Sequence, residues 1–264
     1  MEHLAPDVWT ERIVAEGFPT VSAVVFTPSR AFVVDTLSRP QEMEPVLALL
    51  ERQAAGRRVV VVNTHHHWDH VYGNAAFAGG DIVAHRTCPR LMVAQGTTAD
   101  EAIPEQPPEG VPLPTITFGD RLTYTDEPET VHLIHTPGHS EDSLVVFVAR
   151  AGILFAGDTV EWPLPSFAQR DATDTWVRTL RQLKQLPVDL IVPSHGLPKP
   201  KSIIDANERY IVGVHEAVAA AKSKGVGRQE LHLPAAQFLA DGVGVDPVYE
   251  ASHARNVVWA WDEC

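Results

Sequence analysis

Residues 57–70 read RRVVVVNTHHHWDH, an apolar run that passes directly into a cluster of histidines and one aspartate. Four consecutive valines are typical of a strand buried on both faces, because β-branched side chains favour an extended backbone. The histidine cluster begins where this strand must end. The segment therefore predicts a buried strand with a metal site at its carboxyl end.

The cluster contains the spacing His-x-His-x-Asp-His, formed by His65, His67, Asp69 and His70. Imidazole and carboxylate are ligands that suit Zn²⁺ and related divalent ions. In an extended or looped segment His65 and His67 point to the same side, so they can hold one ion. Asp69 and His70 can reach an adjacent ion, while His66 is expected to face away. A solvated histidine-rich loop is disfavoured because the cluster follows a buried strand directly.

The rest of the chain alternates between strand and helix patterns. Apolar β-branched runs at 21–26 and 31–35, separated by a turn with Pro28, predict a hairpin. Residues 96–114 contain five prolines and little periodicity, which predicts a loop and a candidate lid. Helices are expected at 40–56 and 174–186 and through most of the region from 202, and strands at 57–63, 81–85, 115–120, 130–136, 143–149, 152–158 and 188–193.

This order is strands, helix, strand and candidate site, followed by more strands, a helix, a strand and another candidate site. The similarity of the two halves predicts an α/β protein in which two mixed sheets pack face to face with helices outside. No linker divides the sequence, so we expect a single domain over 1–264. Its helical extension would begin at about residue 202.

Composition narrows the function classes. The chain of 264 residues has 21 Lys and Arg against 34 Asp and Glu, a formal net charge of −13. So acidic a surface repels phosphate backbones, and the densest basic cluster is only Lys199 and Lys201, so nucleic acid is not an expected partner. The N-terminus lacks the pattern of a secretory signal, and no apolar stretch is long enough to span a membrane. Two distant cysteines, Cys88 and Cys264, form no disulfide framework, which favours the cytoplasm.

Three further candidates follow predicted strands. His139 lies in HTPGHSEDS, Asp158 in LFAGDT and His195 in IVPSHG. Each alone is weak evidence, because a histidine after a strand is more often a surface or hydrogen-bonded residue. Together with the first cluster they are stronger evidence for a metal site, because all four loops leave strand ends where one shared site can form.

This set of motifs resembles the metallo-β-lactamase superfamily, over residues 20 to 200 of the chain. The resemblance implies an αββα sandwich, four layers with the metals at one edge of the two sheets. It also implies that His65, His67 and His139 bind a first metal, that Asp69, His70 and His195 bind a second, and that Asp158 bridges the two. Asp35, in FVVDT, matches a carboxylate below the metal loop that supports the site without binding the ion.

The resemblance further implies a metal-dependent hydrolase with two Zn²⁺ ions and a bridging hydroxide that attacks a carbonyl. Catalysis would then depend on Asp158 and on Asp69, which can orient the nucleophile or carry its proton. Relatives with a redox diiron centre have glutamate where this chain has His67, which favours zinc, with iron or manganese as alternatives. A mononuclear iron persulfide dioxygenase shares the histidine frame and is a second hypothesis. A metal-binding module without catalysis is the third.

The substrate is expected to be a small ester, lactone, thioester or amide. Classical β-lactamases with a metal-binding cysteine carry it near the position of Asp158, so β-lactam turnover is expected only as a side activity. Glutathione recognition lacks the usual basic patch, since Lys199 and Lys201 are the only nearby pair. A homo-oligomer is left open. Residues that could line the pocket or support the ligands are Asp35, Trp68, His85, Trp162 and Phe167.

Overall fold

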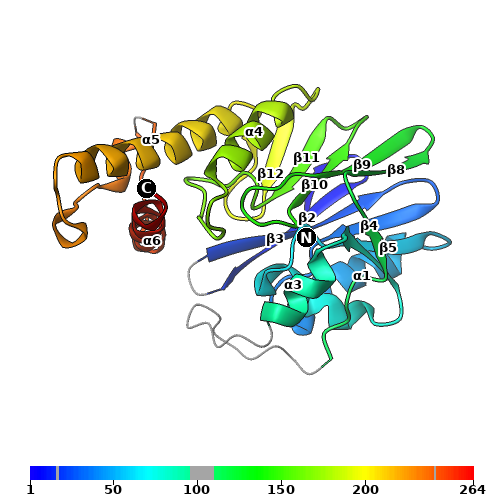
Figure 1. The fold of residues 1–264 in the computed structure, drawn as a ribbon. Helices are drawn as coiled ribbons and strands as arrows, with labels where there is room; N and C mark the ends of the chain where they lie inside the picture. The colour runs from blue at the N-terminus through cyan, green and yellow to red at the C-terminus, as the bar shows by residue number, and fades with distance from the viewer. Residues whose placement is uncertain (16–17, 96–109, 241) are drawn as a thin grey trace.

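The computed structural model describes residues 1–15, 18–95, 110–240 and 242–264. Over these residues the chain forms two β-sheets that pack face to face, with helices on the two outer faces (Figure 1). The predicted α/β class and the sandwich of two mixed sheets are therefore confirmed. Most of the predicted lid, 96–114, lies outside the described residues.

The first sheet has seven strands in sequence order, antiparallel from β1 to β4 and parallel from β4 to β7. Its strands are β1 (Glu2–Ala5), β2 (Val8–Ala15), β3 (Phe18–Phe26), β4 (Arg30–Val34), β5 (Arg58–Val62), β6 (Asp81–His85) and β7 (Ile116–Phe118). The second sheet has six strands in the order β13-β12-β11-β10-β9-β8, with β11 and β12 parallel and the other pairs antiparallel. Its strands are β8 (Arg121–Asp126), β9 (Glu129–His135), β10 (Leu144–Val148), β11 (Ile153–Gly157), β12 (Leu190–Pro193) and β13 (Lys199–Pro200).

Strand β5 shows why the valine run is continuous. Val60 and Val62 face the core between the two sheets, whereas Val61 faces the helix-covered side. Both faces of the strand are buried, so alternation between polar and apolar residues is absent. Helix α1 (Glu44–Gln53) covers this outer side, and α4 (Thr173–Leu183) and α5 (Ile203–Ser223) cover the second sheet. The remaining helices are α2 (Trp68–Val71), α3 (Cys88–Gln95) and α6 (Pro247–Glu263).

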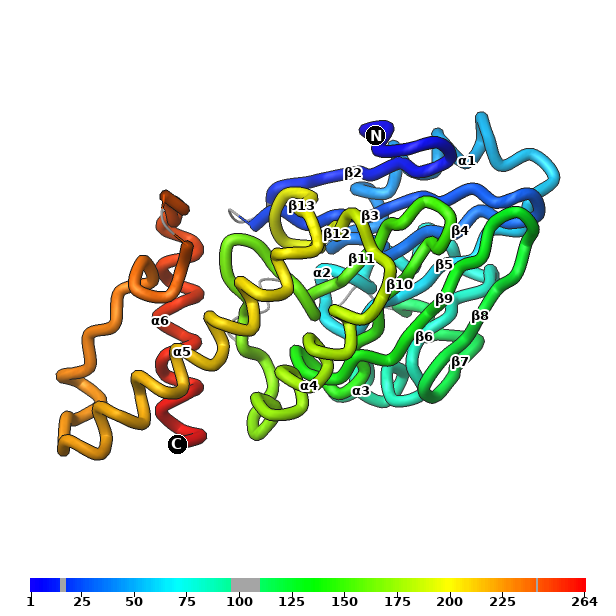
Figure 2. The backbone as a smooth tube through the Cα atoms, turned by 90° about the horizontal axis from the view of Figure 1, so that it is seen from above, coloured from blue at the N-terminus to red at the C-terminus, as the bar shows by residue number. Residues whose placement is uncertain are grey.

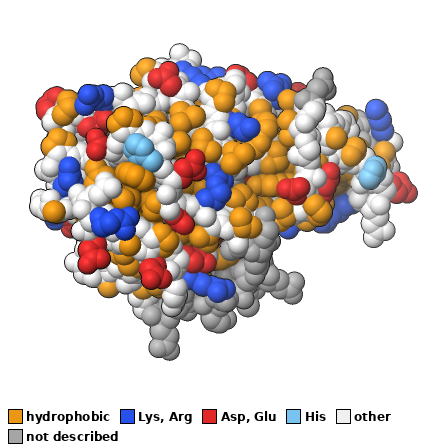
Figure 3. All heavy atoms as spheres, turned by 180° about the vertical axis from the view of Figure 1, so that it is seen from behind, with side chains coloured by type: hydrophobic (Ala, Val, Ile, Leu, Met, Phe, Trp, Pro, Cys, Tyr) orange, Lys and Arg blue, Asp and Glu red, His pale blue; other side chains and the backbone are white. Residues whose placement is uncertain are grey.

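Helices α5 and α6 extend beyond the sandwich at one end, as Figure 2 shows. Their buried residues join those of α4 in one hydrophobic cluster, so the extension from about residue 202 packs against the helix that covers the second sheet. Within the described ranges, no helix combines the length and the apolar character that a bilayer crossing requires. On the rear face in Figure 3, Lys and Arg side chains lie scattered among acidic and apolar ones, in keeping with the acidic composition.

The sequence patterns did not predict four of the described strands. Strands β1, β2, β8 and β13 lie at or near sheet edges and carry many polar residues, so they lack a clear apolar run. In helix α1 the apolar Leu47 is 37% exposed, whereas Leu49 is buried. The inward stripe is therefore Met43, Val46, Leu49 and Leu50.

Gly73 lies where the segment after α2 packs against the loop after β4. A Cβ atom at this position would lie 1.7 Å from the carbonyl oxygen of Thr36, which belongs to the backbone and cannot rotate away. We therefore expect Gly73→Ala to lower the free energy of unfolding by about 3 kcal/mol or more, because the two segments must separate. Urea unfolding measures the change. Gly244→Ala, which places its methyl group in open space, should leave stability nearly unchanged.

Candidate metal centre

All the predicted ligands lie at one edge of the sandwich, directly after strands. His65 and His67 follow β5, and Asp69 and His70 belong to the short helix α2 that begins next. The other three come from the second sheet: His139 lies between β9 and β10, Asp158 follows β11, and His195 follows β12. Both sheets therefore contribute side chains to one place.

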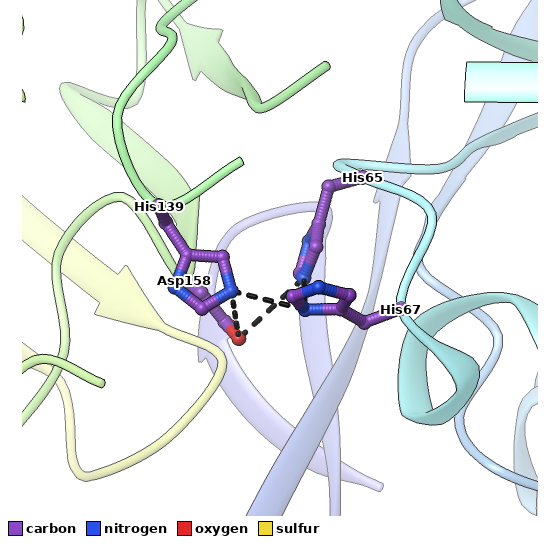
Figure 4. A group of neighbouring side chains, drawn as sticks. All are labelled: His65, His67, His139 and Asp158. Carbon is purple, nitrogen blue, oxygen red and sulfur yellow. Dashed lines mark hydrogen bonds and ion pairs between the residues drawn. The ribbon is translucent and has the colours of Figure 1, made fainter. Parts of the chain in front are cut away.

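The first group comprises His65, His67, His139 and Asp158, whose ligand atoms lie within 4.8 Å of one another (Figure 4). Nδ1 of His67 lies 2.9 Å from Nε2 of His65 and 3.0 Å from Nε2 of His139. Oδ2 of Asp158 lies 3.6 Å from Nε2 of His65 and 3.5 Å from that of His139. Tetrahedral zinc with ligands at about 2.0 Å separates its ligand atoms by about 3.3 Å, so these spacings suit one ion.

The second group comprises Asp69, His70 and His195. Oδ2 of Asp69 lies 3.4 Å from Nε2 of His70 and 3.3 Å from Nε2 of His195. Asp158 borders this group too, because Oδ1 lies 3.4 Å from Nε2 of His70 and Oδ2 lies 3.2 Å from Nε2 of His195. The structure thus brings together the seven predicted ligands in two groups with Asp158 between them.

Two unpaired atoms show that the residues fit a cation. Nε2 of His70 and Oδ1 of Asp158 are buried and have no hydrogen-bond partner among the described residues. A buried polar atom without a partner costs about 1 to 3 kcal/mol. A divalent ion between the two groups would satisfy both atoms, and the donor set of imidazoles and carboxylates suits zinc.

The far nitrogen of three ligands is held by an acceptor. Nδ1 of His70 lies 2.9 Å from Oδ2 of Asp35, and Nδ1 of His139 lies 2.9 Å from the Ser166 carbonyl oxygen. Nδ1 of His195 lies 2.7 Å from the carbonyl oxygen of Pro19 in β3. Because a carbonyl or carboxylate oxygen can only accept, Nδ1 carries the proton in each ring and leaves Nε2 to the site. Asp35 thus lies beneath the metal loop, as expected, whereas the sequence patterns did not indicate Pro19 or Ser166.

Burial and neighbouring charges shift the pKa values of the candidate ligands in different directions. Burial lowers the pKa of His65 and His67, and neighbouring histidines lower it further, so both rings are neutral. Burial also lowers the pKa of His70 and His195, but the adjacent carboxylates outweigh it and raise the pKa of both. Burial raises the pKa of Asp158, yet the surrounding histidines hold it well below its usual range. Without a cation, protons neutralise this carboxylate cluster, and a metal would replace them.

Trp162 and Phe167, candidates to line the pocket or support the ligands, pack against other groups. Nζ of Lys199 lies 4.2 Å from the centre of the Trp162 ring, and Trp162 also lines a groove of about 1020 Å³ beside α4 and α5. The Phe167 ring stacks on His215 with ring centres 5.2 Å apart. Both rings are partly buried against the hydrophobic cluster that includes the C-terminal helices. A pocket or supporting role for these two residues stays a prediction.

The other expected pocket residues have local partners. Trp68 of α2 packs near Tyr72, the residue that follows this helix, with ring centres 6.4 Å apart. His85 stacks on His135 at 3.8 Å, and its Nδ1 lies 2.9 Å from Oγ1 of Thr87. A pocket role for Trp68 and His85 stays a prediction. His66 faces away from the ligands, as expected, with Nδ1 2.8 Å from Oδ1 of Asp142.

The pairing of His85 and His135 makes stability depend on pH. Burial and the neighbouring His135 lower the pKa of His85 to about 4. The fold therefore prefers the neutral ring, and this contribution is complete above pH 6.5 and is lost as the pH falls through 4. We expect His85→Gln to reduce the loss of unfolding free energy between pH 7.5 and 5 by on the order of 1 kcal/mol. Urea unfolding of metal-free protein at both values measures this, and His232→Gln, at an exposed position, should leave the pH dependence unchanged.

Comparison with known proteins identifies relatives of the chain. It is 32% identical over 161 residues to a hydroxyacylglutathione hydrolase from Thermosynechococcus vestitus, covering 60% of this chain and 54% of that protein. It is 23% identical over 254 residues to a linear primary-alkylsulfatase from Pseudomonas sp., covering 79% of this chain and 48% of that protein. The chain thus spans about half the length of these curated relatives.

The fold has solved counterparts. A metallo-beta-lactamase from Pontibacter korlensis superposes with a TM-score of 0.63 and 22% identity, covering 77% of this chain and 94% of that one. A family model for the metallo-beta-lactamase superfamily matches residues 15–195, which include all seven candidate ligands. Because this match covers well over half of the sequence, the chain belongs to the metallo-beta-lactamase superfamily.

Proposed function

We propose that the chain is a dinuclear zinc hydrolase that cleaves a small ester, lactone, thioester or amide. The observation that supports this most directly is the position of Asp158 between two groups of ligand atoms. Its Oδ1 lies near His70 of the second group, and its Oδ2 lies near histidines of both groups, so the carboxylate can bridge two ions. The first group would hold one ion through three imidazoles, and the second through Asp69, His70 and His195.

Divalent cations bound there would lower the pKa of water toward about 7 and polarise a substrate carbonyl. The residues of this chain would position the attacking water. Asp69 is 14% exposed at its side chain, and its pKa lies below the usual range because His70 and His195 outweigh the effect of burial. Its ionised carboxylate, next to solvent, can accept a hydrogen bond from the attacking water and orient it.

The basic pair considered for glutathione is engaged elsewhere. Lys199 lies over the ring of Trp162, and Nζ of Lys201 donates to the carbonyl oxygen of Leu186. Neither contact belongs to the metal groups. We therefore propose a small activated acyl compound as the substrate class and do not single out a glutathione thioester. We also propose the cytoplasm as its location, because both cysteines are free and Cys88 is buried.

Elemental analysis tests this proposal together with its alternatives. Metal-replete protein is expected to contain close to two zinc ions per chain and to hydrolyse at least one compound in a panel. The panel includes an aryl ester, a lactone, a hydroxyacyl-glutathione, a chromogenic β-lactam and an alkyl sulfate. One iron per chain with oxygen consumption on a persulfide would instead establish a dioxygenase. Bound metal without turnover of any compound would favour a binding module.

A further inference from the structure

The segment 161–167, between β11 and α4, passes directly behind the ligand His139. The carbonyl oxygen of Ser166 accepts the Nδ1 proton of His139 at 2.9 Å. Because this contact decides which ring nitrogen keeps the proton, the position of one backbone carbonyl controls the orientation of the ring. Two asparagines, Asn207 and Asn256, hold the segment that carries this carbonyl.

The start of the segment is fixed by α5. The backbone N–H of Glu161 donates to Oδ1 of Asn207 at 2.9 Å, and Nδ2 of Asn207 donates to the Glu161 carbonyl oxygen at 2.8 Å. The Glu161 carboxyl group then accepts the backbone N–H of Ser166 at 2.7 Å and its hydroxyl at 3.1 Å. Glu161 is fully buried, so these contacts are shielded from water.

The end of the segment is fixed by α6 in the same manner. Nδ2 of Asn256 donates to the carbonyl oxygen of Pro165 at 2.7 Å, and Oδ1 accepts the backbone N–H of Phe167 at 2.8 Å. The amide therefore bonds the backbone on both sides of Ser166. Asn256 is 1% exposed, and its Nδ2 also lies 2.9 Å from the hydroxyl of Tyr210 in α5.

Helix α6 lies outside residues 15–195, the part of the chain that the family model matches. Figures 1 and 2 show it beside the segment between β11 and α4. We propose that Asn256 is a positioning residue, which acts through Ser166 to keep the His139 ring oriented with Nε2 free for a divalent cation. The inference rests on the proposed function, because it takes His139 as a metal ligand.

The expected effect of losing Asn256 follows from the two backbone hydrogen bonds that its side-chain amide makes. Without it, two buried backbone groups, the Pro165 carbonyl and the Phe167 N–H, lose their partners. The segment relaxes to recover hydrogen bonds, and the Ser166 carbonyl moves with it. Groups that orient a metal-binding histidine typically change metal affinity by about 10- to 100-fold when they are lost.

The variants Asn256→Ala and Asn256→Asp test the proposal. Aspartate has the same shape and keeps the acceptor for Phe167, but it places an oxygen against the Pro165 carbonyl, and it serves where the alanine variant does not fold. Asp262→Asn is the matched control, because Asp262 also lies on α6 and forms ion pairs with Arg170 and Arg228. Its contacts do not include the segment 161–167.

Two readouts separate positioning from general stability. Nitrogen-15 NMR of histidine in metal-free protein reports which nitrogen of His139 carries the proton, and chelator competition measures zinc affinity. We expect both Asn256 variants to mix the two tautomers and to bind one zinc about 10- to 100-fold more weakly. Melting temperatures of the metal-free variants show that they are folded.

Wild-type affinity and an unchanged His139 tautomer in a folded Asn256 variant would overturn the proposal. An equal loss in Asp262→Asn would overturn it as well, because general loosening of α6 would then explain the effect. A wild-type chain that binds no zinc would contradict the proposed function. The tautomer of His139 in metal-free protein would still decide whether Asn256 orients the ring.

Discussion

Replacement of Asp158 by alanine is expected to reduce kcat/KM by about 10³-fold or more and to lower the zinc content from two ions to one or none. The carboxylate lies within 3.6 Å of a ligand nitrogen in each group, so its removal weakens both sites at once. A metal pair stabilises the transition state by several kcal/mol, and each loss of about 1.4 kcal/mol lowers the rate about tenfold. Steady-state kinetics and elemental analysis of the same sample measure the two effects.

The matched control for Asp158→Ala is Asp174→Asn, which changes an exposed aspartate at the start of α4. It should keep both zinc ions and full turnover. The isosteric Asp158→Asn offers one oxygen only, so we expect it to retain more zinc than the alanine variant while its activity stays low. Two zinc ions and near-normal activity in Asp158→Ala would contradict a bridging role.

Replacement of Asp35 by asparagine is expected to weaken zinc binding at the second group by about 10- to 100-fold. Oδ1 of Asp35 accepts the Thr64 backbone N–H at 2.7 Å, and Oδ2 accepts the Thr64 hydroxyl at 2.7 Å and Nδ1 of His70 at 2.9 Å. An amide N–H facing His70 meets a second N–H. The ring relieves this conflict only by moving its proton to Nε2, the atom that must bind metal.

The same substitution suits the backbone, because Asp35 has a φ of 59° and asparagine tolerates this left-handed region well. The loss should therefore concern metal more than folding, and chelator competition with thermal unfolding of metal-free protein separates the two. Asp126→Asn is the control, since Asp126 also accepts three hydrogen bonds, from Thr27 and Ser29, and lies at the opposite end of β9 from the His139 loop. Unchanged affinity in Asp35→Asn would show that His70 does not need this acceptor.

The sequence predicts the interior of the fold well and its edges poorly. Runs such as 59–62 and 144–148 are buried on both faces, so their apolar character is continuous and easily seen. Strand β8 alternates between exposed and half-buried residues, and β13 is two residues long, so neither leaves a strong pattern. The exposure of Leu47 could not be predicted either, because an apolar spacing alone does not decide which side of a helix meets the sheet.

The candidate ligands could be predicted because each follows a recognisable strand and carries a side chain with metal-binding chemistry. The residues that orient them could not. Pro19 and Ser166 act through backbone carbonyls, which every residue possesses, so their identity carries no signal. Asn207 lies 46 residues along the chain from Glu161, and Asn256 lies 91 residues from Pro165, so only the tertiary fold brings them together.

Each group of ligand atoms takes side chains from both halves of the chain. His65, His67, Asp69 and His70 precede residue 71, whereas His139, Asp158 and His195 come from the second sheet. During synthesis the first four emerge long before their partners, so neither group is complete until the second sheet has formed on the first. A cation held there would cross-link the two sheets, and it would bind only after they had met. It would therefore stabilise the assembled sandwich over any state in which the sheets are apart.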